Sequence, residues 1–77
     1  MYEQEEFGMN EIIFLVEEAH EGGFVARALG EASIITEADT REGLREAVRD
    51  AVRCHFDEGV RPSFIRLHFV QEEVIAA

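Results

Sequence analysis

The stretch "EIIFLVEEAHEGGFVARALG", residues 11–30, decides the fold. Its first part, Glu11–Glu18, is rich in β-branched and aromatic residues, which predicts a β-strand. The alternating faces of that strand are Ile12, Phe14 and Val16 on one side and Ile13, Leu15 and Glu17 on the other. Because both faces are largely apolar, we expect the strand to lie at the centre of a sheet and to be covered on both sides.

The glycines that follow this strand indicate a tight hairpin. Gly22 and Gly23 supply the positive φ angles that such a turn needs, and Phe24–Gly30 then alternates like a second strand. A phosphate-binding loop would instead lead from a strand into the N-terminus of a helix, and a P-loop would carry a lysine. The chain contains no lysine and no helix pattern follows directly, so we interpret these glycines as turn residues.

Residues 39–59 predict an amphipathic helix. Asp39 is the expected N-cap, with Glu42 three residues later in a pattern like a capping box, and Gly59 is the expected end. Apolar side chains recur at spacings of three and four along this segment, which predicts one stripe that faces a core. The stripe consists of Leu44, Ala47, Val48, Ala51, Val52 and His55.

Two further strands complete the pattern. Ser33–Ala38 predicts a short third strand and Ser63–Val70 a fourth, which residues 71–77 extend as a tail. The order β-β-β-α-β predicts an α+β fold, a two-layer sandwich with one helix on a mostly antiparallel four-stranded sheet. We expect a single domain over residues 9–77, preceded by a flexible N-terminal extension over residues 1–8.

One helix covers only one face of such a sheet, so the other face is expected to be a partner or oligomer interface. An uncovered apolar patch usually marks a site of association. We therefore expect a homo-oligomer, a dimer or larger, in which Glu17 pairs with a basic residue across the interface. The predicted interface residues are Ile13, Leu15, Val25, Arg27, Leu29, Arg66 and His68.

Composition narrows the class of partner. The 77 residues include 17 acids and 7 bases, a net charge of −10, which repels nucleic-acid backbones and suits a basic protein. The longest apolar run, Ile12–Val16, is too short to span a membrane. The acidic N-terminus does not resemble a signal peptide, and the lone Cys54 forms no intrachain disulfide. We therefore expect a cytoplasmic protein that binds neither nucleic acid nor membrane.

Four arginines at a spacing of four form a basic row along the predicted helix. An acidic residue precedes three of them by three positions, so i,i+3 ion pairs neutralise the row locally. We interpret the row as a solvated face rather than as a nucleic-acid ridge. The arginines are Arg41, Arg45, Arg49 and Arg53, and the acids are Glu42, Glu46 and Asp50.

The histidines and the cysteine do not form a metal-ligand pattern. Cys54 and His55 are neighbours on the helix, where their side chains diverge by about 100°, whereas zinc ligands converge. We expect His55 at the end of the apolar stripe and Cys54 to be half-buried. The cluster Glu17, Glu18 and Glu21 is interpreted as a charged turn rather than a magnesium site. No catalytic, metal or cofactor-binding residue is expected, and no cofactor.

Two motifs with the helix behind them resemble the N-terminal domain of HicB-like antitoxins. They are "EGGFVA" at residues 21–26 and "TEADTRE" at residues 36–42. The family reads Gly-Gly-Tyr/Phe-x-Ala and Thr-x-Gly-Asp-Thr at similar spacing, and the resemblance covers residues 12–70. Residues 31–34 lack the Leu-Pro-Gly-Cys of the family, and Ala38 replaces its glycine. Gly43 interrupts the first helical turn.

The resemblance implies a degenerate RNase H-like domain without nuclease activity. It implies a non-catalytic protein-interaction module that binds and neutralises a small basic RNA-cleaving toxin. The C-terminal DNA-binding segment of full-length HicB proteins has no counterpart before Ala77, so a stand-alone domain is expected. The alternative is a small metabolic accessory or ligand-binding domain, because "DAVRCHF" at residues 50–56 also resembles chains labelled as a 2-oxoacid dehydrogenase component.

Overall fold

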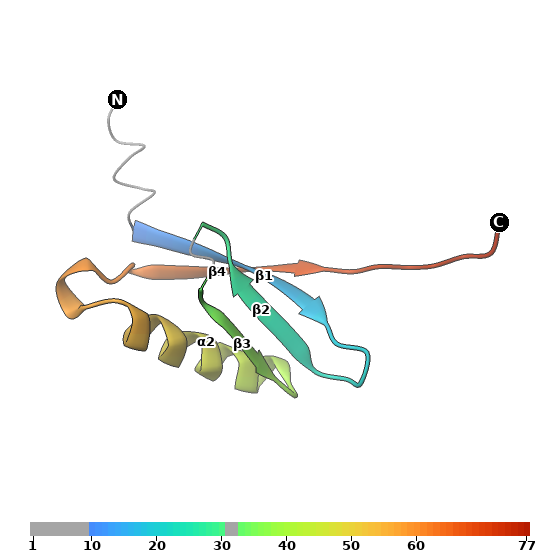
Figure 1. The fold of residues 1–77 in the computed structure, drawn as a ribbon, viewed down its shortest axis with the longest axis horizontal. Helices are drawn as coiled ribbons and strands as arrows, with labels where there is room; N and C mark the ends of the chain where they lie inside the picture. Colours follow the sequence, from blue (N-terminus) through green and yellow to red (C-terminus); the bar gives the residue numbers. More distant parts are fainter. Residues whose placement is uncertain (1–9, 31–32) are drawn as a thin grey trace, which may run out of the picture.

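A four-stranded sheet with one helix against one of its faces makes up the fold (Figure 1). The computed structural model describes residues 10–30 and 33–77. The expected order β-β-β-α-β is confirmed, whereas the extension expected over residues 1–8 lies outside the described residues. The elements are β1 (Glu11–Glu18), β2 (Phe24–Ala28), β3 (Ile35–Ala38), α2 (Arg41–His55), the short 3₁₀ helix η1 (Glu58–Val60) and β4 (Phe64–Val70).

The sheet is mixed, with the strand order β3-β2-β1-β4. The hairpin makes β1 and β2 antiparallel, and β3 continues antiparallel beside β2. The chain then crosses through α2 and returns as β4, parallel to β1, as a strand joined by a helical crossover usually does. The central position predicted for Glu11–Glu18 is confirmed, and β4 occupies one edge of the sheet.

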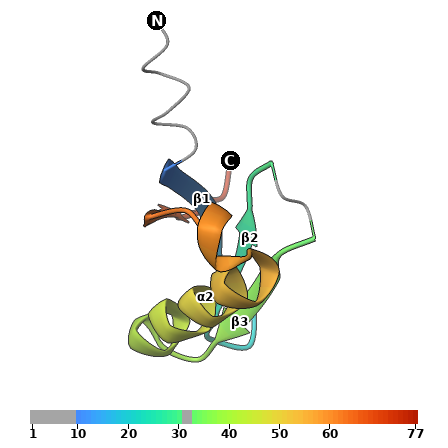
Figure 2. The same ribbon diagram turned by 90° about the vertical axis from the view of Figure 1, so that its left-hand side faces the viewer.

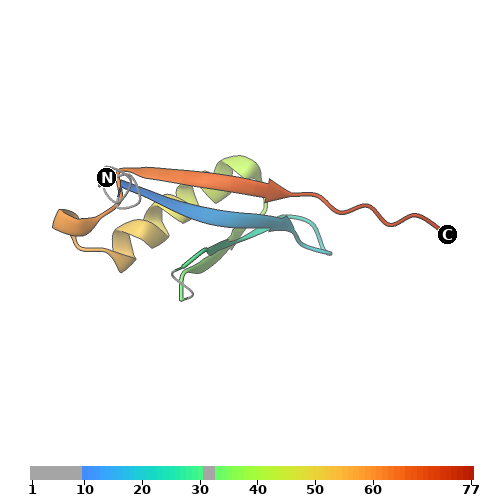
Figure 3. The same ribbon diagram turned by 90° about the horizontal axis from the view of Figure 1, so that it is seen from above.

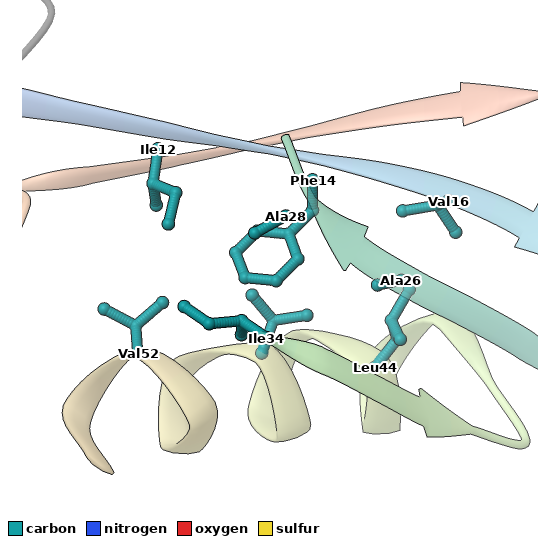
Figure 4. Close-up of a cluster of buried hydrophobic side chains, with 9 residues drawn as sticks. Ile12, Phe14, Val16, Ala26, Ala28, Ile34, Leu44 and Val52 are labelled. Atoms are coloured by element: carbon teal, nitrogen blue, oxygen red, sulfur yellow. The ribbon is translucent and has the colours of Figure 1, made fainter. Parts of the chain in front are cut away.

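The core lies between α2 and the face of the sheet that carries Ile12, Phe14 and Val16 (Figure 4). Phe14 and Val16 are fully buried, since strict alternation along β1 directs both toward the helix. On the opposite face of β1, Ile13 and Leu15 are only half-buried, because no described element covers that face (Figure 2). The remaining core residues are Ala26, Ala28, Ile34, Leu44, Val48 and Val52.

The hairpin between β1 and β2 packs directly against the start of the helix. Gly22 and Gly23 have φ angles of 98° and 87°, as their sequence predicted. A Cβ atom on Gly23 would lie 2.8 Å from the backbone oxygen of Ala38 and 3.3 Å from the Cα of Asp39. Only glycine therefore allows the turn to approach the junction between β3 and α2, and this approach brings the two sequence motifs together.

The helix begins and ends differently from the sequence prediction. Thr40, not Asp39, is the N-cap, and its hydroxyl accepts a hydrogen bond of 2.9 Å from the backbone N–H of Gly43. The helix ends at His55, before Gly59, because the chain turns extended at Phe56. The Phe56 side chain then packs against the core at the position expected for His55. His55 itself is exposed, with its ring 4.9 Å from that of Phe56.

The replacement Gly23→Ala should destabilise the fold by at least about 2–3 kcal/mol, because it combines a left-handed backbone with a backbone clash. Gly22→Ala is the matched control: Gly22 has a similar φ, but a Cβ atom there meets nothing within 4 Å. That variant should lose only about 1 kcal/mol. Urea denaturation measures both, and equal losses would contradict the close approach of Gly23 to Ala38.

Candidate protein-interaction surfaces

The uncovered face of the sheet, called the open face below, carries all seven residues predicted for an interface. Strand register places Leu15 beside Arg27 on one side and His68 on the other. Ile13 pairs with Arg66 and accepts a backbone hydrogen bond from Leu29. Val25 lies opposite Glu17 in the β1–β2 ladder. The structure thus gathers these residues on one surface, and their role as an interface stays a prediction.

Three further apolar side chains lie on the open face, and one of them is Val70, which is half-buried and pairs with Glu17. Ile35, 58% exposed, pairs with Arg27, and Phe64, 67% exposed, pairs with Glu11. Ile35 and Phe64 were not predicted for this face. The alternation of residues within β3 and β4 does not by itself show how these strands align with their neighbours, or where β4 begins. Once the register is known, the open face has an apolar centre whose edges reach β3 and the beginning of β4.

Two ion pairs within the chain lie on the open face. The Arg66 Nε–H donates a hydrogen bond to a Glu11 carboxylate oxygen, and Glu17 lies 4.0 Å from the guanidinium of Arg27. Glu17 was expected to pair across an interface, but its partner here belongs to the same chain. The hydrogen bond from Arg66 lowers the pKa of the Glu11 carboxyl below its ordinary value, and the attraction of the guanidinium charge adds to this effect.

The arginine row on α2 is exposed and partly paired, as predicted. Arg53 lies 2.7 Å from Asp50, and Arg49 lies 3.6 Å from Glu46. Such exposed i,i+3 pairs contribute about 0.2–0.5 kcal/mol each. Arg41 has another role, since its guanidinium lies 4.2 Å from the ring centroid of Phe69, a cation–π contact at the start of the helix.

A groove runs between α2 and β4, because the helix packs mainly against β3 and β2 and leaves β4 less covered. Apolar side chains from both elements form its floor, and arginines from α2 and from the segment before β4 form its rim. Arg61 has a buried Nε atom with no hydrogen-bond partner among the described residues. The floor consists of Val48, Val52, Ile65 and Leu67, and the rim of Arg45, Arg49, Arg53 and Arg61.

This groove was not predicted from the sequence. The periodicity of the helix indicated one solvated face of arginines, but it does not show which strand the helix lies closest to. The only available signal was the apolar set Ile65, Leu67 and Phe69 on β4, which is half-buried in the structure.

Carboxylates gather at the opposite end of the molecule from η1. Around the β1–β2 hairpin and the end of β4, five glutamates surround a shallow hollow that also includes His20. We call this surface the acidic end, defined by Glu17, Glu18, Glu21, Glu37 and Glu72. Three of these glutamates were recognised in the sequence as a charged turn, and the pairing of β3 with β2 adds Glu37.

The histidines and the cysteine are dispersed. His20 lies in the hairpin, His68 on the open face, and Cys54 at the end of α2, where it is exposed rather than half-buried as expected. Within residues 10–30 and 33–77, no group of three or more His, Cys, Asp or Glu side chains is arranged to hold a metal ion. Among the same residues, no helix has the length and apolar character needed to cross a membrane.

Replacing Arg66 with glutamine should raise the pKa of Glu11 toward its ordinary value of 4.5. Because the folded-state pKa is depressed, the pair stabilises the fold above the unfolded-state pKa and loses this effect as the pH falls through the folded-state pKa. Carboxyl NMR titration measures the shift. Arg27→Gln, also on the open face, should leave the Glu11 titration unchanged, and an equal shift there would contradict the assignment.

Comparison with known proteins identifies relatives in two organisms. A UPF0150 protein of Thermotoga maritima is 42% identical over 66 residues, which cover 86% of this chain and 91% of the relative. A UPF0150 protein of Archaeoglobus fulgidus is 59% identical over 51 residues, 66% of this chain and 74% of the relative. No model of a protein family matches the chain, and no solved structure gives a significant match. The extent and identity of the first similarity show that the chain belongs to the UPF0150 family.

Proposed function

We propose that this protein is a non-catalytic interaction module of the HicB antitoxin type, which binds and neutralises a small basic RNA-cleaving toxin. The observation that carries the proposal is the acidic end, where five glutamates from the hairpin, β1, β3 and the chain after β4 surround one hollow. Concentrated negative charge of this kind attracts a basic partner and accelerates its association. Membership of the UPF0150 family is compatible with a HicB-like assignment and with a degenerate RNase H-like fold.

The two sequence motifs that resemble HicB proteins support this proposal through their position. Gly23 of the first motif packs against Ala38 and Asp39 of the second, and Thr40 of the second motif caps α2. The shared motif residues therefore have one structural purpose, which is to fix the hairpin against the helix start. This places Glu21, at the tip of the acidic end, next to a rigid junction.

The distribution of charge supports a basic partner rather than a nucleic acid. Of the α2 arginines, Arg49 and Arg53 are paired with acidic neighbours, Arg45 lies at the groove and Arg41 lies over an aromatic ring. By contrast, His20 is the one side chain among the residues that line the acidic end that can carry a positive charge. A basic protein would meet the carboxylates at this end first. The remaining negative charge of the chain, −10 in total, would strengthen the long-range attraction.

Co-expression with a toxin-like protein encoded beside this gene should yield a stable complex and restore growth. The double variant Glu18→Lys/Glu21→Lys should weaken that complex and reduce the rescue, because it reverses charge at the acidic end. Glu42→Lys/Glu46→Lys, the matched control on α2, makes the same net change of charge away from the acidic end. Rescue that is equal in both variants, or that is lost equally, would contradict binding at this surface.

The open face is the proposed interface between copies of the chain. Ile13, Leu15 and Val25 are only half-buried in the isolated chain, and Leu29 is 51% exposed. Completing the burial of such side chains contributes about 1 kcal/mol or more for each, which is large for a domain of this size. The ion pairs of Glu11 with Arg66 and of Glu17 with Arg27 leave no unpaired acidic residue of β1 on that face.

Leu15→Asp should therefore lower the mass of the assembly by half, because it introduces a charge at the apolar centre of the open face. Val60→Asp is the matched control, since Val60 is 66% exposed in η1 and lies outside the open face. Sedimentation equilibrium at micromolar concentrations measures both variants. An unchanged mass for Leu15→Asp, or a wild-type chain that sediments as a monomer, would contradict this interface.

A further inference from the structure

The C-terminal tail, residues 71–77, continues the direction of β4 beyond the sheet and away from the body of the molecule (Figure 3). Its two large apolar side chains are exposed, Val74 to 94% and Ile75 to 76%. Neither side chain packs against the core of its own chain. An extended segment that presents two aliphatic side chains to solvent has the composition of a strand whose neighbour is missing.

The groove between α2 and β4 has the complementary composition. Its floor is apolar, and its rim includes Arg45, for which the described residues provide no ion pair or hydrogen bond, and Arg61, whose buried Nε lacks an acceptor. The tail sequence "QEEVIAA" supplies two carboxylates beside two aliphatic side chains. Groove and tail are therefore matched in both charge and polarity.

The tail does not reach the groove of its own chain. It leaves β4 in a straight line (Figures 1 and 3), and residues 71–77 contain no glycine or proline that would favour a reversal. The groove lies beside β4 itself, which is an edge strand with one side paired to β1 and the other side unpaired in the sheet. A free edge of this kind accepts an additional strand from another chain.

We infer that two copies of this protein exchange their tails, each tail forming an antiparallel strand on the free edge of the partner's β4 and filling the partner's groove. A twofold axis perpendicular to the sheet at Gln71 places residues 72–77 of one copy opposite residues 65–70 of the other, so that Ile75 lies opposite the partner's Leu67 and Glu73 opposite its Phe69. The same rotation makes the sheet continuous across the two copies and keeps both helices on one side. Closed twofold pairing of this kind is the commonest form of homo-oligomer.

Alternation along the strand assigns each tail side chain to a face. Leu67 and Phe69 point to the helix side, so Glu73 and Ile75 follow on that side if the strand continues. Ile75 then enters the apolar floor near the partner's Leu67. Glu73 lies opposite the partner's Phe69 and therefore meets the partner's Arg41, whose guanidinium lies over that ring.

This inference does not rest on the proposed antitoxin function, and of the residues that line the groove only Phe64 also belongs to the open face. Leu15 and the acidic glutamates of the hairpin take no part in the groove. The tail exchange and the association through the open face therefore predict different results for the same chain, and each has variants that leave the other intact.

The first test compares Ile75→Asp with Ala76→Asp in sedimentation equilibrium. Ile75→Asp should weaken dimerisation by about a hundredfold or more, because a twofold dimer loses two buried isoleucines. Ala76→Asp adds the same charge one position further, on the other face, and should keep the dimer. Leu15→Asp should also keep the tail dimer, and the double variant Leu15→Asp/Ile75→Asp should be a monomer. An assembly of unchanged mass in Ile75→Asp would overturn the exchange.

The second test uses charge reversal. Glu73→Arg and Arg41→Glu should each weaken the homodimer about tenfold or more, because both contacts then join like charges. Mixing the two variants should restore the dimer, since tail and helix are complementary at both contacts of the mixed pair, and the double variant should restore it within one chain. A mixture that remains as weak as its components would overturn the inference, as would single variants that dimerise like the wild type.

Discussion

The pairing of β1 with both β2 and β4 is the constraint on which the other surfaces depend. It places an apolar strand inside a four-stranded sheet, and in the described part of the chain the helix that covers this sheet is α2, with 15 residues. The helix buries Ile12, Phe14 and Val16. It leaves the opposite face open and β4 only partly covered, so a small domain retains two apolar surfaces that an isolated chain does not bury.

The hairpin of β1 and β2 also determines how firmly the helix is held. Gly23 allows the turn to contact the backbone of Ala38, and directly after this contact Thr40 caps the helix. Phe24 then packs edge-to-face on Phe69 with a centroid separation of 6.1 Å, and Arg41 lies over the Phe69 ring. The start of the helix therefore contacts both β2 and β4. The groove opens between α2 and β4 further along the helix.

Charge is divided among the surfaces rather than spread evenly. The carboxylates concentrate at the hairpin end, and the groove is lined by arginines despite the net charge of −10. The proposed exchange of tails would bring carboxylates to the groove and would join two sheets edge to edge. The two open faces would then form one continuous surface, which is the geometry that association between pairs of copies requires.

The sequence by itself determined the elements and the open face, because both follow from local periodicity. Alternation in Glu11–Glu18, the two positive-φ glycines and the stripe Leu44, Val48 and Val52 were sufficient for the order of elements along the chain and for the interface prediction at residues such as Leu15 and His68. Only the tertiary structure decided the cap at Thr40, the exposure of Cys54 and His55, the acidic end and the groove. These features depend on how separate elements approach one another: the close contact of Gly23 sets the helix start, and the lean of α2 toward β3 opens the space beside β4. Helical and strand periods specify which side of an element is apolar, but they do not specify how far the neighbouring element lies from it.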